Sequence, residues 1–563
     1  MPKLLQINVT ANWGSTGKIA EQIGQMAIQK GWDSYIAYGR MMNPSKSKLI
    51  KIGTNVDVYL HYLVSRLWDA EGLASKRATR KLTKEIDRIK PDIVHLHNIH
   101  DHYLNYPVLF EYLANNNIPV VWTQHDQWAT TGHCAFNLVG CDRWKMLCHD
   151  CPECQRWSLD RSKRNYLLKK KLFSSVRNLT VVSVSDWLND QIKASFLGQH
   201  SLRVIKNGVD TDVFKPTVMD VRKRYGIGEK KIILGVASVW SKMKGLEDFD
   251  KLSRLISDEW VIVLVGHLRD SITSDRIIHI ERTQNQLELA QLYSASHVLV
   301  SLSRSETFGL TIVEGMACGT PAIVCDNTAQ PELVTDETGA VVKENDIDAL
   351  LCCIERFKDK TVEVASRCRE RAEKFFKQNS SSNEYISLYN RMLGGGVMLL
   401  AVAHPWSERK GLKDYISLSK KIPDNVIIVL VGLNKEQKKN LPSNVVGLCA
   451  TQNVEELVNL YSMADIVLNL SYAETFGLTT IEGFACGTPG IVYDVTASPE
   501  LITEDVGKVV AASDIDGVVT AVQQILSVEK PVDKCRKRAL DYYKNTDRIE
   551  QYFDLYDAIR NRN

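Results

Sequence analysis

The sequence lacks a strong excess of charge of either sign and has no long apolar run. Its 563 residues include 70 Lys and Arg against 67 Asp and Glu. Such a balance gives no overall field that would hold a polyanion, so nucleic acid is not expected as a partner. The most apolar stretches, such as VMLLAVA, have the length of a strand and fall far short of the roughly 18 residues that span a bilayer. We therefore do not expect an integral membrane protein.

Features of an export signal are also missing at the N-terminus. The segment MPKLLQINVT has one Lys and a short strand-like run, without a long apolar core and a small-residue cleavage site. The 13 cysteines are an odd number, and in a chain without an export signal they are expected to be reduced thiols. We expect a cytoplasmic protein.

The pattern that is present is an alternation of short apolar runs and amphipathic stretches. KLLQINV is followed by KIAEQIGQMAIQKG, and PDIVHLH by YPVLFEYLANNN. This order is typical of βαβ units and predicts an α/β fold with doubly wound parallel sheets. A chain of this length favours three domains over one.

An internal repeat dominates the second half of the chain. The segment SRSETFGLTIVEGMACGTPAIVCDNTAQPEL, from Ser303, recurs from Ser471 as SYAETFGLTTIEGFACGTPGIVYDVTASPEL. Upstream, SVWSKMKGLEDF pairs with HPWSERKGLKDY. RVIKNGVDTDVFKP contains turn residues and predicts an interdomain hinge, while Gly394 to Gly396 predict a flexible joint. The predicted domains are 1–205, 206–393 and 397–563.

Two carboxylates, Glu306 and Glu314, flank a predicted helix start in ETFGLTIVE. If the helix begins around Gly309, the amides of Phe308, Gly309 and Leu310 point outward without partners and form an anion site. A diphosphate fits there, and Glu314 is then placed to accept hydrogen bonds from vicinal hydroxyls. The alternative is a strand, loop and helix with solvent-exposed glutamates.

A lysine precedes a Gly-Leu pair in both repeats. Lys244 follows the predicted strand KIILGVAS, where a cation neutralises charge that develops on a leaving diphosphate. Its equivalent is Lys410, which follows Arg409 where the first copy has Met243. A surface lysine on a helix face is the alternative.

Polar residues also follow two predicted strands of the N-terminal region. His125 and Asp126 come after IPVVWTQ, and His97 with Asn98 after PDIVHL. Carboxyl ends of parallel strands line ligand crevices, so His125 is the strongest candidate there. Three other histidines are expected to be structural: His95, His100 and His102.

The loop ANWGSTGKIAEQ joins the first predicted strand to the first helix. Gly14 and Gly17 would let its backbone approach a ligand. The spacing fits neither a Walker A motif nor GxGxxG, which argues against an ATPase.

Five cysteines lie close together in GHCAFNLVGCDRWKMLCHDCPEC. The CxxC spacing of Cys148, Cys151 and Cys154 suits tetrahedral zinc. The candidate structural zinc site consists of Cys134, Cys141, Cys148 and Cys151. Reduced thiols in a loop are the alternative, because the spacing from Cys134 to Cys148 fits no standard zinc pattern.

A basic segment, RSKRNYLLKKKLF, begins at Arg161. It could hold an anionic membrane surface or a lipid diphosphate, which would place the protein peripherally at the inner face of the plasma membrane. A solvated basic helix face is the alternative.

Together these residues resemble the retaining GT-B glycosyltransferases of family 4, group 1, which include bacterial polysaccharide assembly enzymes. The EX7E motif of that family is matched by Glu306 with Glu314 and by Glu474 with Glu482. GSTGKIAEQI, PDIVHLHNIH, HDQWATTGHCAF and DCPEC look like a subgroup tied to capsule, exopolysaccharide or O-antigen synthesis.

The resemblance implies two facing Rossmann-like domains plus a third, duplicated one. It implies that Glu306 contacts the donor sugar, Glu314 the ribose and Lys244 the diphosphate, with His125 at the reacting sugar. The implied donor-binding set is Gly14, Gly17, Lys244, Glu306, Thr307, Phe308, Gly309, Leu310 and Glu314. Its second-copy equivalents are Arg409, Lys410, Glu474, Phe476, Gly477 and Glu482. Met243 departs from the family's usual Arg, and His297 replaces an acidic residue that is kept as Asp465.

We therefore expect retaining transfer of a hexose from a nucleotide diphosphate sugar to a hydroxyl of a growing, lipid-linked glycan, with no cofactor required for catalysis. The first copy has the shorter tether to the N-terminal domain, so we expect it to be catalytic and the second to be an accessory domain. A non-catalytic nucleotide-sugar-binding or scaffold protein, and an epimerase or phosphorylase of the same fold, are the alternatives.

Overall fold

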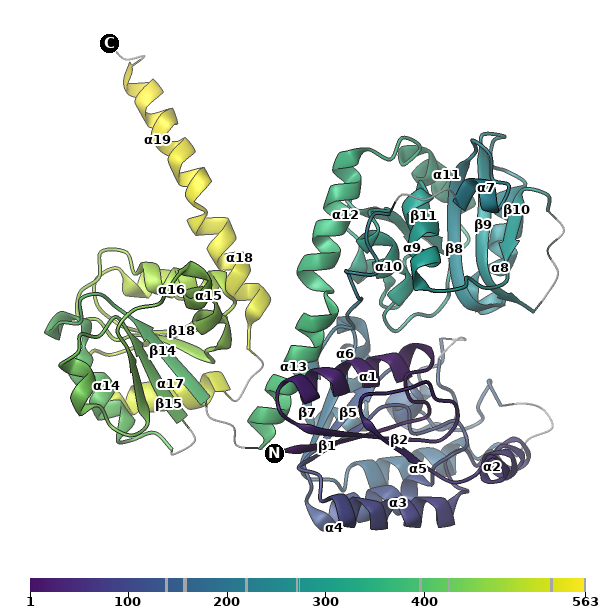
Figure 1. The fold of residues 1–563 in the computed structure, drawn as a ribbon, viewed down its shortest axis with the longest axis horizontal. Coiled ribbons are helices and arrows are strands. Elements are labelled where there is room, and N and C mark those ends of the chain that lie inside the picture. The colour runs from purple at the N-terminus through teal and green to yellow at the C-terminus, as the bar shows by residue number, and fades with distance from the viewer. Residues whose placement is uncertain are drawn as a thin grey trace. The chain divides into compact units, whose positions relative to one another are not determined.

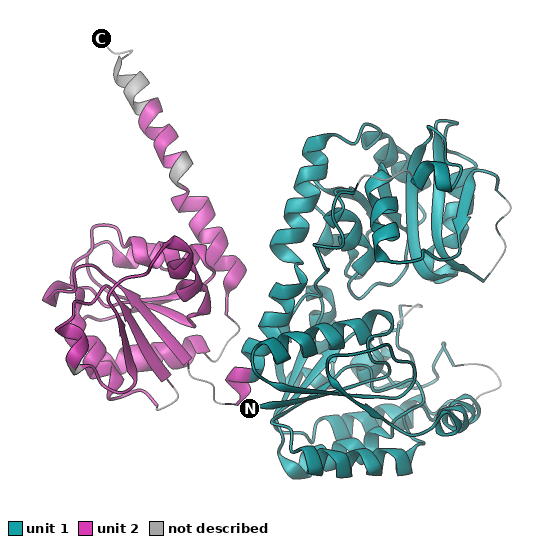
Figure 2. Ribbon diagram, viewed as in Figure 1, with its two compact units in different colours: residues 1–389 teal, residues 390–563 magenta. Residues whose placement is uncertain are grey.

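The computed structural model describes two compact units, residues 1–389 and 390–563 (Figure 2). The residues left out of the description are 137–139, 155–158, 218–220, 270–271, 273, 394–396, 424–425, 527–529 and 561–563. The predicted glycine joint, Gly394 to Gly396, therefore lies outside the described residues. The described part contains three parallel sheets with helices, as the α/β prediction requires (Figure 1).

The first sheet has seven parallel strands in the order β3-β2-β1-β4-β5-β6-β7. The strands are β1 (Lys3–Asn8), β2 (Asp33–Tyr38), β3 (Lys48–Lys51), β4 (Ile93–Leu96), β5 (Val120–Gln124), β6 (Leu179–Ser183) and β7 (Ser201–Val204). The α-helices are α1 (Gly14–Gln29), α2 (Asn55–Trp68), α3 (Lys76–Ile89), α4 (Tyr106–Asn116), α5 (Ser162–Phe173) and α6 (Asp186–Lys193). The 3-10 turns are η1 (Trp128–Thr130), η2 (Arg143–Lys145) and η3 (Phe196–Gln199). Helix α1 covers one face of this sheet and α3 and α4 cover the other (Figure 1).

The local sequence explains these elements. Strands β4, β5 and β6 are buried at every position, because helices on both faces leave no side of the sheet in water. Helix α2 begins with a capping box in which Thr54 and Asp57 exchange hydrogen bonds. Helix α4 is capped by the Asn105 side chain, which accepts from the amide of Val108.

The second sheet has six parallel strands in the order β10-β9-β8-β11-β12-β13. The strands are β8 (Lys231–Trp240), β9 (Trp260–Leu268), β10 (Ile277–Ile280), β11 (Val298–Ser301), β12 (Ala322–Cys325) and β13 (Gly339–Val342). The helices are α7 (Val221–Arg224), α8 (Leu246–Ser253), α9 (Gln286–Ala295), α10 (Leu310–Ala317), α11 (Ile347–Arg356), α12 (Val362–Phe375) and α13 (Gln378–Met392), with the 3-10 turns η4 (Lys242–Lys244) and η5 (Gln330–Leu333).

Two chain segments run side by side between these sheets. The amide of Val209, in the predicted hinge, donates to the carbonyl of Phe376 at 2.8 Å, and the amide of Gln378 donates back to Val209 at 3.0 Å. Helix α13 then packs on the first sheet, where the Tyr389 hydroxyl is 2.6 Å from His95 Nδ1. The range 206–393 that the sequence assigns to one domain thus ends on the sheet of another.

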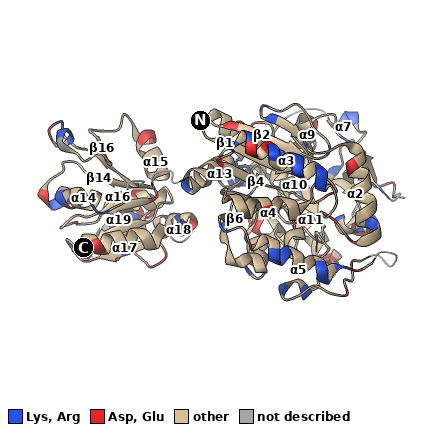
Figure 3. Cartoon of the chain, turned by 90° about the horizontal axis from the view of Figure 1, so that it is seen from below, with Lys and Arg blue, Asp and Glu red and all other residues tan. Residues whose placement is uncertain are grey.

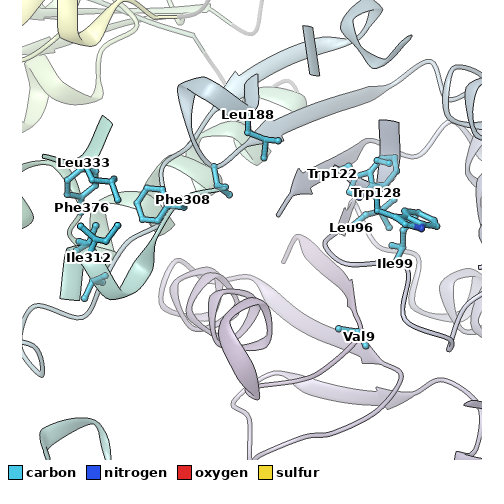
Figure 4. Packing of buried hydrophobic residues seen from close by; sticks show 14 of the residues in the cluster. Val9, Leu96, Ile99, Trp122, Trp128, Leu188, Phe308, Ile312, Leu333 and Phe376 are labelled. Atoms are coloured by element: carbon cyan, nitrogen blue, oxygen red, sulfur yellow. The ribbon is translucent and has the colours of Figure 1, made fainter. Parts of the chain in front are cut away.

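One apolar core runs through the first unit. Its buried side chains come from both sheets and from the helices between them, as Figure 4 shows for Trp122 and Trp128 and for Phe308 with Phe376. Phe308 and Phe376 lie edge to face with ring centroids 5.9 Å apart. This shared core places residues of the EX7E loop in the same packed body as the N-terminal sheet.

The second unit has a six-stranded parallel sheet in the order β16-β15-β14-β17-β18-β19, which matches the strand order of the second sheet. The strands are β14 (Val397–Val402), β15 (Val426–Val431), β16 (Val445–Leu448), β17 (Ile466–Asn469), β18 (Gly490–Tyr493) and β19 (Gly507–Val510). The helices are α14 (Leu412–Ser419), α15 (Val454–Met463), α16 (Leu478–Ala485), α17 (Ile515–Leu526), α18 (Val532–Tyr543) and α19 (Asn545–Arg560), with the 3-10 turns η6 (Glu408–Lys410), η7 (Gln437–Asn440) and η8 (Ser498–Leu501). Across the described parts of both units, no helix combines the length and the apolar character that crossing a membrane requires.

Candidate active site

An ion pair marks the crevice of the second sheet. Lys244 ends the turn η4 after β8, Glu306 follows β11, and the ammonium of one contacts the carboxylate of the other. The strand order reverses between β8 and β11, and doubly wound sheets bind ligands at the carboxyl ends of the strands at such a point. The two residues singled out by sequence therefore meet where a ligand is expected.

A glycine allows this close approach. Gly245 has a φ of +74°, and a Cβ there would lie 2.5 Å from the carbonyl oxygen of Leu302. Only glycine adopts this conformation at such a contact without strain. The loop on the other side is held by the amide of Glu306, which donates to Thr328 Oγ1 at 3.0 Å.

Helix α10 begins at Leu310 with Gly309 as its N-cap, as the sequence predicts. Gly309 has a φ of +102°, and among the described residues no side chain caps this helix end. The first amides of a helix have no partner within it and carry the positive end of its dipole. An anion would be bound favourably at this end, beside Lys244.

Glu314, one turn into α10, is partly buried. Its Oε2 accepts a hydrogen bond from the Tyr293 hydroxyl at 3.1 Å. Burial raises the pKa of the Glu314 carboxyl to about 7, while the positive charge of Lys18, in α1, acts in the opposite direction. The sequence analysis missed both Tyr293 and Lys18, although Tyr293 recurs at the matching position of the repeat as Tyr461.

His125 follows β5 and is linked to the EX7E loop. The Thr307 hydroxyl donates to the carbonyl oxygen of His125 at 2.7 Å. His125 Nε2 lies 3.1 Å from Nδ1 of His97, and burial lowers the pKa of His125 to about 4. The imidazole of His125 is therefore neutral near pH 7, so it is able both to donate and to accept a hydrogen bond.

A charged pair lies next to this neutral imidazole. His100 Nε2 is 2.8 Å from Oδ2 of Asp126, and this carboxylate raises the pKa of His100 to about 9 against the effect of burial. The other Asp126 oxygen accepts from the amide of Trp128 at 2.9 Å. His95 has a structural role as expected, since its two nitrogens contact Tyr389 and Thr123.

The two glycines of the first loop have different surroundings. Gly14 has a φ of +64° and open space where a Cβ would point, as a loop that faces a ligand would need. Gly17 lies inside α1, and a Cβ there would come within 2.6 Å of Thr10 Oγ1. Close packing of α1 on the loop after β1 therefore gives a further reason for this glycine, and its approach to a ligand stays a prediction.

The second unit contains the same arrangement of side chains. Lys410 pairs with Glu474, and the Tyr461 hydroxyl donates to Glu482 Oε2 at 2.7 Å. Helix α16 again has a glycine N-cap, Gly477 with a φ of +84°. Arg409, the neighbour of Lys410, is exposed.

One aromatic residue differs in burial between the two copies. Phe308 is 3% exposed in the shared core of the first unit, whereas its equivalent Phe476 is 46% exposed. In the described chain, the first copy therefore has its motif loop packed within a larger body.

One departure from the family pattern, His297, lies away from the ion pair, and so does its equivalent in the second unit, Asp465. His297 Nδ1 accepts from the amide of Ile232 at 3.2 Å, and Asp465 accepts from the amide of Met398 at 2.9 Å. Both residues thus tie down the start of a neighbouring strand, at the end of the sheet opposite to the crevice. Met243 contributes its backbone carbonyl, which accepts from the amide of Arg304 at 2.9 Å.

The basic segment lies mainly on α5 (Figure 3). Lys163, Arg164, Lys170 and Lys171 are exposed. Lys169 is instead buried, and its ammonium donates to the carbonyls of Trp128 at 2.7 Å and Thr131 at 3.1 Å. Lys169 is therefore not available to a membrane-facing basic surface, because its side chain is bound inside the protein.

Comparison with known proteins assigns the family. The model of glycosyl transferases group 1 matches residues 219–375 and again 398–542, and that of glycosyltransferase family 4 matches residues 19–213. The chain is 24% identical over 364 residues to the putative colanic acid biosynthesis glycosyl transferase WcaC of Escherichia coli, covering 61% of this chain and 88% of that protein. It is 27% identical over 186 residues to the lipopolysaccharide core biosynthesis mannosyltransferase LpsB of Rhizobium meliloti, covering 29% and 52%.

Solved structures show the same fold. A sucrose-phosphate synthase from Thermosynechococcus elongatus superimposes with a TM-score of 0.53 at 17% identity, over 70% of this chain and 99% of that one. Anabaena HepE, solved in complex with UDP and glucose, gives a TM-score of 0.50 at 16% identity, over 69% and 99%. With the family models matched over residues 19–213, 219–375 and 398–542 and the parallel-sheet architecture shared with these structures, the chain belongs to the group 1 and family 4 glycosyltransferases and is a glycosyltransferase with Rossmann-like GT-B domains.

Proposed function

We propose that this glycosyltransferase moves a hexose from a nucleotide diphosphate sugar to a hydroxyl of a growing, lipid-linked bacterial surface glycan, with retention at the anomeric carbon. The observation that carries the proposal is the Lys244–Glu306 pair at the open N-terminus of α10, in the same packed unit as His125. The names of WcaC and LpsB, which refer to colanic acid and lipopolysaccharide, support a surface glycan as the product. The proposed location is the cytoplasm, at the inner face of the membrane that holds the acceptor.

In this proposal four groups around the second sheet bind the donor. Its diphosphate lies against the first amides of α10 with Lys244 as counter-charge, and its ribose hydroxyls donate to Glu314. The Glu306 carboxylate then accepts a hydrogen bond from a hydroxyl of the donor sugar. This new bond replaces part of the contact between Glu306 and Lys244. HepE, solved with UDP and glucose, supports a nucleotide sugar as the ligand class.

Charge on the departing diphosphate is stabilised by residues of the chain. Lys244 and the α10 N-terminus are fixed in place by Gly245, Gly309 and the Thr328 hydrogen bond before the reaction begins. Preorganised groups of this kind act where charge develops, and removing one costs about 10²- to 10³-fold in rate. No metal ion is part of the proposed mechanism, and the acceptor attacks from the face that the diphosphate leaves.

His125 contributes a neutral imidazole on the opposite side of the sugar. Because its pKa lies far below 7, it forms hydrogen bonds to a sugar hydroxyl without adding a positive charge. The hydrogen bond from Thr307 to the carbonyl oxygen of His125 holds the EX7E loop next to the residue that carries this imidazole. We assign His125 to the reacting sugar on this basis.

The first copy is the catalytic one in this proposal, and the second copy is an accessory nucleotide-sugar or assembly domain. The bond from Thr307 to His125 and the burial of Phe308 support this assignment, since both join the first copy to the N-terminal sheet. The intact Lys410–Glu474 pair supports ligand binding by the second copy.

The test has two steps. Thermal-shift screening of nucleotide sugars identifies the donor, because a ligand at about 100 times its dissociation constant stabilises a protein by about 2.7 kcal/mol. Release of nucleoside diphosphate is then measured with and without lipid-linked acceptor glycans. Release that requires the acceptor, with a product of the donor's anomeric configuration, is the expected result. Binding without any transfer would identify a scaffold protein, and inversion or absolute Mg²⁺ dependence would refute the mechanism.

A further inference from the structure

Four cysteines that are spread over the segment after η1 line one small hollow of the first unit. All four belong to the segment between η1 and α5, and Cys148 and Cys151 are three positions apart in it. The hollow is lined by Cys134, Cys141, Cys148 and Cys151 together with His133, Arg143, Trp144, His149, Pro152 and Glu153.

We propose that these four cysteines form a structural zinc site, independent of the transfer reaction. Zn²⁺ in structural sites takes four ligands in a tetrahedron and binds thiolate well, and Cys148 and Cys151 have the CxxC spacing that supplies two of them. Binding replaces four S–H protons by four Zn–S bonds, so four protons are released and the site carries a net charge of about minus two.

Groups around the hollow suit that negative charge. The amide of Gly132 donates to the Cys148 sulfur at 3.3 Å, and such a hydrogen bond stabilises the negative charge of a metal-bound thiolate. The Arg143 side chain lines the same hollow and donates to the carbonyl of His149 at 2.8 Å, so a cation belongs to the wall of the hollow.

The described residues of this segment have little regular secondary structure. Between η1 and α5, the described residues form only the short turn η2, yet Trp144 within it is 2% exposed. A metal crosslink stabilises a region that has too little apolar core of its own. It would also stiffen the wall of the crevice, because the amide of Gln127, two residues after His125, donates to the carbonyl of Ala135 at 2.8 Å.

A second group of ligand-type atoms lies nearby and provides the control. Asp69, His133 and Cys154 have ligand atoms within 4.8 Å of one another. His133 and Asp69 are already hydrogen-bonded at 2.6 Å, and Asp69 also accepts from the amide of Arg161 at 3.0 Å. Three groups with this internal bonding fit a structural role, so we place the metal on the four cysteines of the hollow.

The full chain, purified without chelators under reducing conditions, is analysed for metal by plasma mass spectrometry. About one zinc per chain is expected. Cys134→Ser, Cys141→Ser, Cys148→Ser and Cys151→Ser should each lower zinc content at least fivefold, whereas Cys154→Ser and the exposed-site control Cys449→Ser should retain it. Loss of zinc in Cys154→Ser with retention in Cys141→Ser would overturn the assignment in favour of the second group.

Wild-type protein provides a test that does not depend on the folding of variants. Cobalt substitution should give the thiolate-to-metal charge-transfer and visible bands of a tetrahedral site. Native alkylation should leave Cys134, Cys141, Cys148 and Cys151 unmodified until a chelator is added, while Cys352 and Cys449 react in both conditions. A chain that takes up no zinc from added ZnCl₂, or that contains a Cys134–Cys151 disulfide by mass spectrometry, would refute the proposal. None of these measurements depends on transferase activity. A negative result for the zinc site can therefore be distinguished from a negative result for the proposed function.

Discussion

Removing the charge of Glu314 should stabilise the protein while it abolishes donor binding. Glu314→Gln keeps an oxygen that accepts from the Tyr293 hydroxyl but lacks the carboxylate that burial disfavours. A carboxyl whose pKa is higher in the folded state binds its proton more tightly there than in the unfolded chain. Stability of the first unit is therefore lost as pH rises from about 4.5 to about 7.

The magnitude follows from that pKa. A rise of the Glu314 pKa from 4.5 to about 7 corresponds to a loss of about 3 kcal/mol in the free energy of unfolding. Nearly all of this loss is present at pH 8. At pH 5 the Glu314 carboxyl is mostly ionised in the unfolded chain but mostly protonated in the folded protein. The loss of stability caused by its burial is then only about 1 kcal/mol. Glu314→Gln should thus raise the free energy of unfolding of the first unit by about 3 kcal/mol at pH 8 and by about 1 kcal/mol at pH 5.

Urea or thermal unfolding of wild type and Glu314→Gln at the two pH values measures this difference. Glu482→Gln, the same change in the second unit, should leave the transition of the first unit unchanged. With a saturating nucleotide sugar, wild type should gain about 2.7 kcal/mol at 100 times the dissociation constant, and Glu314→Gln should gain little. Equal stabilisation at pH 5 and pH 8, or destabilisation at pH 8, would refute the role of burial, and an unchanged ligand effect would refute the role in donor binding.

Three further substitutions test the assignment of the site. Lys244→Ala should lower kcat by about 10²- to 10³-fold while Lys410→Ala leaves it within about twofold, measured by nucleoside diphosphate release; similar losses in both would mean that the two copies act together. His125→Ala should lower kcat/KM by about 10²-fold, and the wild-type rate should show no titration of His125 between pH 6 and 8, because its pKa is about 4; a step near pH 6.5 that His125→Ala abolishes would contradict this. Thr307→Val should cost about 1 kcal/mol in the unfolding of the first unit, with Thr475→Val as the matched control; an equal effect of both on that transition would contradict a link from Thr307 to His125.

The sequence by itself determined the fold class and the local shape of the motif. Alternating apolar runs predicted parallel sheets, because a strand buried on both faces is apolar along its length and must be followed by a crossover helix. The start of α10 next to Gly309 was also predictable, since a glycine with positive φ before an apolar helical run is a local property of the chain. Such features depend on residues that are neighbours in sequence.

Only the tertiary structure decided which residues meet. Lys244 and Glu306 are 62 positions apart, and Thr307 and His125 are 182 apart, so their contacts depend on strand order and on the packing of two sheets. Burial likewise cannot be read from a basic or acidic residue type: Lys169 is folded inward to bind two carbonyls, and Glu314 has a raised pKa. The physical reason is that desolvation and long-range hydrogen bonds are set by what surrounds a side chain in space, which local periodicity does not specify.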